Sequence, residues 1–287
     1  MRHTVGVLGG SGLYDLPGLT DVREVNVETP FGAPSDVLVR GRLGELDLVF
    51  LPRHGRGHRL LPHEVPYQAN VWALKDQGCG WVIGIGAVGS LREHIAPGEA
   101  VLVDQVIDRT TRRESTFFGN GVVAHAGFAD PTCDTLRAYL REACGRSEVT
   151  AHDGGVYVCI EGPAFSSRAE SHLYRAWGAD VIGMTMLPEA KLAREASISY
   201  ASVALVTDYD CWHPSEEDVT VDQLIGVLRA NADRARRLLV EVAPLVAAHD
   251  GPPPKHDAMR TAFVTPRAAM SPEAVHRLRP LLAPYAR

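Results

Sequence analysis

Residues 84–90 read GIGAVGS and directly follow the apolar run that begins at Trp81. The glycines at positions 84, 86 and 89 match the G-x-G-x-x-G fingerprint of dinucleotide-binding folds. An acidic residue, Asp104, stands about twenty residues further on, where a ribose-binding acid belongs. The stretch raises the question of an NAD-dependent enzyme, and its context decides which α/β fold the chain adopts.

The residues after the fingerprint argue against a dinucleotide-binding fold. Such a fold needs the glycine turn to open a helix of about ten or more residues, because the pyrophosphate sits on that helix's N-terminus. Only SLREHIA (90–96) stands before Pro97 and Gly98, and we expect the next strand from about Ala100. We therefore interpret the match as accidental and keep an NAD-dependent dehydrogenase only as a rival. The glycines instead predict a strand end followed by a loop whose backbone N–H groups face an anion.

Short runs of Val, Ile and Leu recur along the chain and predict strands. Several runs are apolar on both faces, as buried central strands are. Segments with helical periodicity lie between them. Strands are expected at 4–8, 35–41, 46–51, 81–86, 100–107, 156–160, 180–184 and 201–206, and helices at 66–77, 135–142, 167–177, 221–247 and 271–282. This mixture predicts an α/β protein with a large mixed sheet.

The sequence GPPPK at 251–255 is the only stretch that resembles a linker. It separates an expected single domain, 1–250, from a C-terminal extension, 251–287. The extension contains one helical segment and is too small to form a domain. We expect it to dock on the same domain or on a neighbouring subunit.

Composition excludes several classes of function. The net charge of −6 and the pI near 6.1 argue against a nucleic-acid partner, which usually needs a strongly basic face. The five cysteines are scattered without C-x-x-C spacing, as in a reducing compartment. No apolar stretch approaches the ~20 residues that span a bilayer, and the N-terminus leads straight into an expected strand. We expect a cytoplasmic protein without a membrane partner.

Two glycine-containing motifs suggest anion binding. In GGSGLYD (9–15), glycines let the backbone approach a ligand and Ser11 adds a hydroxyl, although a simple tight turn fits equally well. In RHGRGHR (53–59), a basic cluster follows a buried strand. That cluster is either a solvated loop or an anion site, in which Arg53 would offer a planar fork to two phosphate oxygens.

The fourth motif, VTDYDCWH (206–213), ends the strand expected at 201–206. In an extended chain Asp208 and Asp210 point the same way, and two carboxylates sharing a partly buried pocket raise the pKa of one of them. Such a pair presents one donor and one acceptor, which complements N7 and the 6-amino group of adenine. A polar turn or a metal site would also use this pattern, but no His or Glu cluster completes a metal site.

Nine motifs in one order strongly resemble the S-methyl-5'-thioadenosine phosphorylases, of the trimeric branch of the purine nucleoside phosphorylases. The resemblance extends from about residue 5 to about residue 245. The motifs are GGSGL (9–13), TPFGAPSD (29–36), RHGRGH (53–58), VPYQANVWALKDQGC (65–79), AVGSLRE (87–93), DQVIDRTTRR (104–113), EGPAFSSRAES (161–171), GMTMLPEAKLAREA (183–196) and TDYDCW (207–212).

The resemblance implies a single α/β domain around a distorted mixed sheet, assembled as a homotrimer. It implies attack of inorganic phosphate, a co-substrate, on C1' of the nucleoside, with no metal or organic cofactor. By the family's motifs, Ser11, Arg53, His54, the Gly86–Ala87 turn and Thr185 hold phosphate; Met184, Phe165, Ser166, Asp208, Asp210, His125 and Val221 hold the nucleoside. Asp208 or Asp210 would protonate the departing base, and we favour Asp208 as the donor.

This chain departs from the family pattern in three places. Gly86 stands where the animal-type relatives have Thr, Ala164 stands where many relatives have Arg, and the sequence after Gly251 matches poorly. The identity of the 5' substituent is therefore left open. A phosphorylase of purine nucleosides or of methylthioinosine, acting on 6-oxo bases, remains an alternative, as do a nucleosidase that uses water and a non-catalytic nucleotide-binding module.

Overall fold

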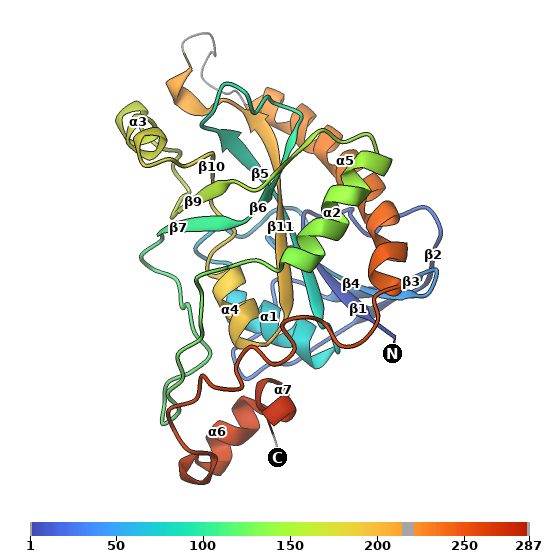
Figure 1. Ribbon diagram of the computed structural model, residues 1–287, viewed down its shortest axis with the longest axis vertical. Helices are drawn as coiled ribbons and strands as arrows, with labels where there is room; N and C mark the ends of the chain where they lie inside the picture. Colours follow the sequence, from blue (N-terminus) through green and yellow to red (C-terminus); the bar gives the residue numbers. More distant parts are fainter. Residues whose placement is uncertain (1, 214–220, 286–287) are drawn as a thin grey trace.

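The computed structural model describes residues 2–213 and 221–285, and for 221–229 only the course of the backbone. Within these residues eleven strands form one mixed sheet (Figure 1). The strands are β1 (Thr4–Gly9), β2 (Leu19–Val25), β3 (Leu38–Leu43), β4 (Leu46–Pro52), β5 (Trp81–Ser90), β6 (Ala100–Val103), β7 (Gln105–Arg109), β8 (Ala151–Asp153), β9 (Val156–Ile160), β10 (Val181–Gly183) and β11 (Ser199–Asp208). The helices are α1 (Tyr67–Asp76), α2 (Asp134–Arg146), α3 (Arg168–Ala176), α4 (Glu189–Glu195), α5 (Val221–Ala247), α6 (Pro272–Arg277) and α7 (Arg279–Leu282).

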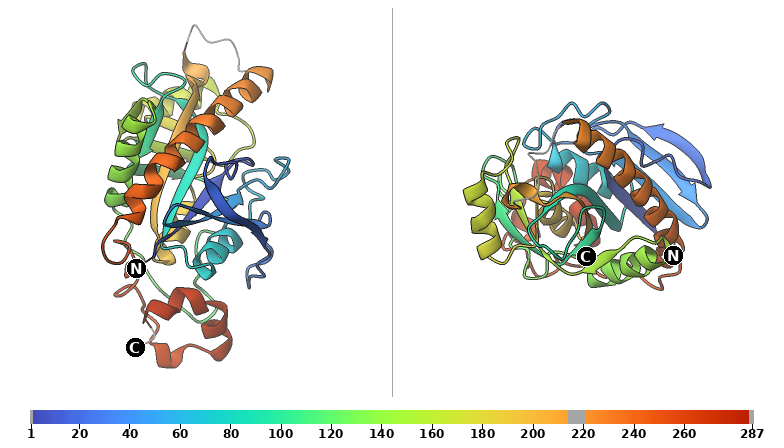
Figure 2. Two further views of the ribbon diagram at one scale, coloured as in Figure 1. Left: turned by 90° about the vertical axis from the view of Figure 1, so that its right-hand side faces the viewer. Right: turned by 90° about the horizontal axis from the view of Figure 1, so that it is seen from above.

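Helices cover both faces of the sheet, as the apolar strands require. Helices α2 and α5 lie together along one face, and α1 with α4 packs on the other (Figures 1 and 2). Each face has its own apolar core, one with Leu136 and Leu238 and the other with Val71 and Leu192. The α/β class and the mixed central sheet flanked by helices are confirmed.

Strand β5 lies in the middle of the sheet, and one of its two edges changes its partner strand half-way along. One edge pairs with β11 over nearly the whole strand. The other edge pairs in parallel with β1 as far as Gly84, and then antiparallel with β10 from Gly89. Between these two positions the sheet opens along that edge of β5, and this gap positions the site described below.

Several sequence expectations need correction. Strand β5 continues to Ser90 instead of ending before a loop, because the small residues pair with β11. The run expected at 100–107 is two strands, β6 and β7, which pair with different neighbours. Strands β2 and β8 and helix α4 were not expected. The carboxylate of Asp104 accepts a hydrogen bond from the Gly155 N–H (2.8 Å), so this acid holds a turn.

The C-terminal segment runs along the lower end of the molecule in Figure 1 and carries α6 and α7. The Trp72 indole N–H in α1 donates to the Arg277 carbonyl (3.1 Å), and Arg279 pairs with Asp76. Buried leucines of the segment, Leu278 among them, join the core around α1. Among the described residues, no helix has the length and apolarity needed to cross a membrane.

Candidate active site

Four parallel strands bring their carboxyl ends to one edge of the sheet. Strands β1, β4, β5 and β11 run in the same direction, and three of the four sequence motifs stand at or after their ends. Ser11 follows β1, Arg53 follows β4, and Asp208 ends β11. The fourth motif, with Gly86, lies inside β5 beside the gap in the sheet. Loops at this edge are where open α/β sheets bind ligands.

The guanidinium of Arg53 bonds to both β1 and β5 at this gap, and the residue is 3% exposed. Its Nε and Nη2 donate to the two carboxylate oxygens of Glu189, at 2.7 and 3.1 Å. Its Nη1 donates to the Ile85 carbonyl (2.9 Å), and Nη2 also donates to the Leu8 carbonyl (3.0 Å). These bonds use four of the five guanidinium hydrogens, which leaves one on Nη1.

This arrangement corrects the expected role of Arg53. The planar fork engages Glu189 and not two phosphate oxygens, because a charge buried this deeply needs a counter-ion. Burial opposes the charge of Arg53, but Glu189 outweighs that effect and raises the pKa of Arg53 above its usual value. The Tyr200 hydroxyl donates to Glu189 at 2.9 Å, so three donors hold this carboxylate. The other arginines of the motif, Arg56 and Arg59, are exposed and point elsewhere.

Gly86, which has no side chain, lies near the Thr185 hydroxyl and near Nη1 of Arg53, the atom with the unused hydrogen. A Cβ atom at Gly86 would lie 3.1 Å from Thr185 Oγ1 and 4.0 Å from Arg53 Nη1. Alternate residues of a strand direct their backbone polar groups to the same edge, so the Ala87 N–H faces the same gap as the Ile85 carbonyl. A hydroxyl, a guanidinium hydrogen and a backbone N–H thus converge on one small space, as anion binding requires.

His54 contributes no positive charge to this space. Burial, followed by the nearby charge of Arg53, lowers the pKa of His54 to about 4. The neutral ring has its Nδ1 at 2.8 Å from the Leu60 carbonyl, which makes Nδ1 the donor and leaves Nε2 as an acceptor. Its ring stacks on His58, with centroids 4.3 Å apart.

Asp208 and Asp210 lie together beside Gly89 of β5, three residues beyond Gly86 along the strand. A Cβ atom at Gly89 would meet Asp208 Oδ1 at 3.0 Å and Asp210 Cβ at 3.2 Å. The pair is not extended as expected, because Asp210 has φ +52° and its N–H donates to Asp208 Oδ1 (2.8 Å). The Thr207 hydroxyl lies 2.5 Å from the other oxygen of Asp208 and 3.1 Å from the Val88 carbonyl, and its one hydrogen can serve either acceptor. Burial raises the pKa of the Asp210 carboxyl.

The remaining base-side residues extend from the loop after β9. The Ser166 hydroxyl donates to Asp210 Oδ2 at 3.1 Å, which brings this loop to the aspartate pair. Phe165, next to it, is 70% exposed. Met184 directly precedes Thr185 and is half-buried, and its sulfur would lie 2.6 Å from a Cβ atom at Gly162. Met184 therefore packs against the start of the loop that follows β9.

For three expected site residues, no hydrogen bond or ion pair between described residues leads to this cluster. Ser11 is exposed in the loop after β1. His125 lies beside the C-terminal segment, where its backbone N–H donates to the Ala262 carbonyl (2.8 Å). Val221 begins α5, and its side chain lies outside the described part of the chain. Their assignments remain predictions.

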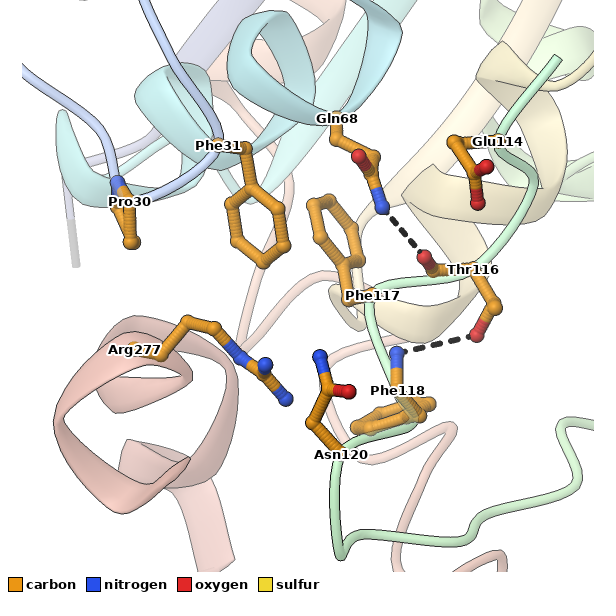
Figure 3. A pocket seen from close by; sticks show the side chains of 9 residues that line it. All are labelled: Pro30, Phe31, Gln68, Glu114, Thr116, Phe117, Phe118, Asn120 and Arg277. Atoms are coloured by element: carbon orange, nitrogen blue, oxygen red, sulfur yellow. Dashed lines mark hydrogen bonds between the residues drawn. The ribbon is translucent and has the colours of Figure 1, made fainter. Parts of the chain in front are cut away.

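A separate pocket lies away from these residues (Figure 3). Its volume is about 270 Å³, and none of the expected site residues lines it. Phe31 and Phe117 form its aromatic wall, with Arg277 of the C-terminal segment opposite. Within residues 2–213 and 221–285, no group of three or more His, Cys, Asp or Glu side chains could hold a metal ion.

Sequence reasoning did not single out Glu189 and Tyr200. The signal for Glu189 was present, since an acidic residue directly after Pro188 suits the first turn of a helix. Its partner Arg53 stands 136 positions away, so the ion pair depends on the tertiary fold. Tyr200 lies inside the apolar strand β11, and nothing in that run marks its hydroxyl.

Comparison with known proteins identifies the family. The family model described as "Phosphorylase superfamily" matches residues 4–244. The chain belongs to this superfamily. Within it, the curated S-methyl-5'-thioadenosine phosphorylase of Geobacter sulfurreducens is 52% identical over 99% of this chain and 100% of its own length. The enzyme of the same name from Thermosynechococcus vestitus is 50% identical, with the same coverage. The chain is therefore a member of the S-methyl-5'-thioadenosine phosphorylase family, and the resemblance seen in its motifs is confirmed.

Solved phosphorylase structures agree with the fold. A methylthioadenosine phosphorylase from an antarctic soil metagenomic library aligns with a TM-score of 0.94 at 49% identity, over 98% of this chain and 100% of the other. The methylthioadenosine phosphorylase of Schistosoma mansoni in complex with adenine aligns with a TM-score of 0.80 at 41% identity. That alignment covers 87% of this chain and 93% of the other. The nucleoside phosphorylase fold is confirmed.

Proposed function

We propose that this chain catalyses the phosphorolysis of S-methyl-5'-thioadenosine by inorganic phosphate, giving adenine and 5-methylthioribose 1-phosphate. It would act as a pentosyltransferase in purine and methionine salvage. The observation that carries this proposal is the layout of β5. Gly86 adjoins the anion space of Arg53 and Thr185, and Gly89, roughly 10 Å further along the strand, adjoins Asp208 and Asp210.

Phosphate in the anion space would attack C1' while the base leaves towards the aspartates. Glycosidic cleavage develops positive charge on the sugar and negative charge on the base. The phosphate, held by Arg53, Thr185 and the Ala87 N–H, stabilises the first. A proton given to N7 of adenine neutralises the second, which contributes about 10²–10⁴ in rate for a well-placed general acid. No step in this scheme requires a metal or an organic cofactor.

The burial of Asp210 supports this residue as the proton donor, although the sequence alone favours Asp208. Asp208 Oδ1 accepts a hydrogen bond from the Asp210 N–H, and its Oδ2 lies 2.5 Å from the Thr207 hydroxyl. Burial raises the pKa of Asp210, so this carboxyl keeps its proton to a higher pH than an ordinary aspartate. Asp208 would then accept from the 6-amino group, which favours adenine over 6-oxo bases.

We further infer a homotrimer in which a neighbouring subunit completes each site. His125 matches a position that shapes the 5' end of the substrate, but its contacts lie near Ala262. Val123 and Val264 beside it are 48% and 62% exposed, and such adjacent apolar side chains suit an interface. A cytoplasmic location and the absence of nucleic-acid and membrane partners belong to the same proposal.

Adenine release from methylthioadenosine, with and without phosphate, tests the reaction. We expect release that requires phosphate and is not inhibited by inosine. Equal release without phosphate would indicate a nucleosidase. Cleavage of inosine at a similar rate would contradict the selectivity assigned to the aspartates and favour a phosphorylase of 6-oxo purine nucleosides.

A further inference from the structure

Arg113 lies between two loops of the candidate site. The phosphate-side loop, residues 184–187, carries Thr185, and the base-side loop, residues 161–166, carries Ser166. Its side chain is 1% exposed. Nη1 donates to the carbonyls of Met184 and Leu187, both at 2.6 Å. Nη2 donates to the Glu161 carbonyl (2.6 Å), and Nε donates to the Glu161 carboxylate (3.0 Å). One guanidinium therefore bonds both loops.

The two phosphate-side bonds enclose Thr185. Met184 precedes it, and Leu187 follows two residues later before α4 begins with Glu189. Fixing the two carbonyls on either side fixes the backbone that presents the Thr185 hydroxyl to Gly86. The Tyr67 hydroxyl of α1 also lies 3.1 Å from Arg113 Nη1 and can share one of its two hydrogens.

The base-side bonds hold the end of β9. Glu161 begins the loop that leads to Ser166, which donates to Asp210. Partial burial opposes ionisation of Glu161, but the N–H groups of Thr111 and Arg113 outweigh it and lower the pKa of Glu161 to about 2. The carboxylate thus neutralises Arg113 and ties the start of the base-side loop to it.

We propose that Arg113 is a positioning residue that holds the phosphate-side loop and the base-side loop at one separation. It touches neither substrate, and it acts through the loops that Thr185 and Ser166 occupy. The proposal rests on the function proposed above. Phosphorolysis needs the phosphate and the nucleoside in one geometry, and a misplacement of about 1 Å costs on the order of 10²-fold in rate. A planar guanidinium suits this task because its donors lie at fixed angles, whereas a lysine offers a single point charge.

The test is Arg113→Lys, with Arg112→Lys as the matched control. Arg112 is the exposed neighbour, and the same substitution there keeps its charge. We expect Arg113→Lys to raise the KM for phosphate and the KM for methylthioadenosine together, each about tenfold or more, and to lower kcat. Thr185→Ala should raise mainly the phosphate KM, and Arg112→Lys should leave both unchanged. Guanidinium added to Arg113→Ala should restore both constants together.

A merely structural role would give a different result. Arg113→Lys would then unfold at a lower temperature but keep wild-type KM values while folded, and that outcome overturns the proposal. A change in only one KM also overturns it. Hydrogen–deuterium exchange separates this proposal from the reaction itself. Whichever reaction the wild type catalyses, exchange should rise at both 160–166 and 184–187 in Arg113→Lys and not in Arg112→Lys. Unchanged exchange in Arg113→Lys contradicts the proposal.

Discussion

The two ends of the candidate site are built differently. At the phosphate end, Arg53 and Glu189 are 3% and 1% exposed, and every bond of the pair is made within the protein. At the base end, Asp208 and Asp210 are half-buried and Phe165 is largely exposed. The proposed phosphate end is thus held in place by bonds within the protein, while the proposed base end carries exposed surface. Preorganised donors are the ones that stabilise charge without rearrangement.

The physical reason for this difference is the cost of buried charge. A buried guanidinium needs a carboxylate partner, so the phosphate end must be assembled completely by the fold. A carboxyl group whose pKa burial raises can remain half-buried in its neutral form. Its proton is then available to the ligand. We expect substitutions at the base end to affect catalysis most, and substitutions at the phosphate end to affect stability and phosphate affinity.

Asp210→Asn should give the largest catalytic effect. The amide keeps the size of the side chain and an acceptor for Ser166, but it removes the proton that would go to N7. We expect kcat for methylthioadenosine to fall about 10²–10⁴-fold, with little change in the phosphate KM. Steady-state kinetics with Asp208→Asn as the comparison provides the measurement. A larger loss of kcat for Asp208→Asn would move the proton donor to Asp208.

The pH dependence provides a second way to test the base end. The reactive form of Asp210 is the protonated one, and burial extends that form to a higher pH than an ordinary carboxyl allows. Wild-type kcat should therefore decline as pH rises through the pKa of Asp210. The residual kcat of Asp210→Asn should lack this decline, and an unchanged profile in the variant would contradict the assignment.

At the phosphate end, Glu189→Ala should give the largest effect on stability. The substitution leaves the buried Arg53 charge without its counter-ion and the Tyr200 hydroxyl without its acceptor. We expect the free energy of unfolding to fall by about 3–5 kcal/mol. Denaturant unfolding measures it, with Glu142→Ala as a control because Glu142 pairs with Arg146 on the surface. That control should lie within about 0.5 kcal/mol of wild type. A similarly small loss for Glu189→Ala would mean that solvent or another group compensates Arg53.

The fold class and most of the central strands followed from the sequence because buried strands leave continuous apolar runs. Helix α4 was not predicted because its residues were interpreted only as part of the family motif at 183–196. For the site, local patterns indicated Arg53 and the aspartate pair as candidates, whereas Thr185 was expected only from the resemblance to the family. The Arg53–Glu189 pair and the hydrogen bonds of Arg113 to the two loops join residues far apart in the chain. No local pattern indicates such partners. The expected fork of Arg53 failed for the same reason, since burial and the counter-ion appear only in the fold.

Gly86→Ala should give the smallest effect and tests where phosphate lies. The added methyl would sit 3.1 Å from Thr185 Oγ1 and 4.0 Å from Arg53 Nη1, inside the proposed anion space. We expect the phosphate KM to rise by up to about tenfold, or ~1.4 kcal/mol, while the KM for methylthioadenosine stays near its wild-type value. The control is Gly145→Ala, because Gly145 lies in α2 with no atom near its added methyl. An unchanged phosphate KM in Gly86→Ala would mean that phosphate binds elsewhere. The Arg53–Glu189 region could then no longer be described as the phosphate end of the site.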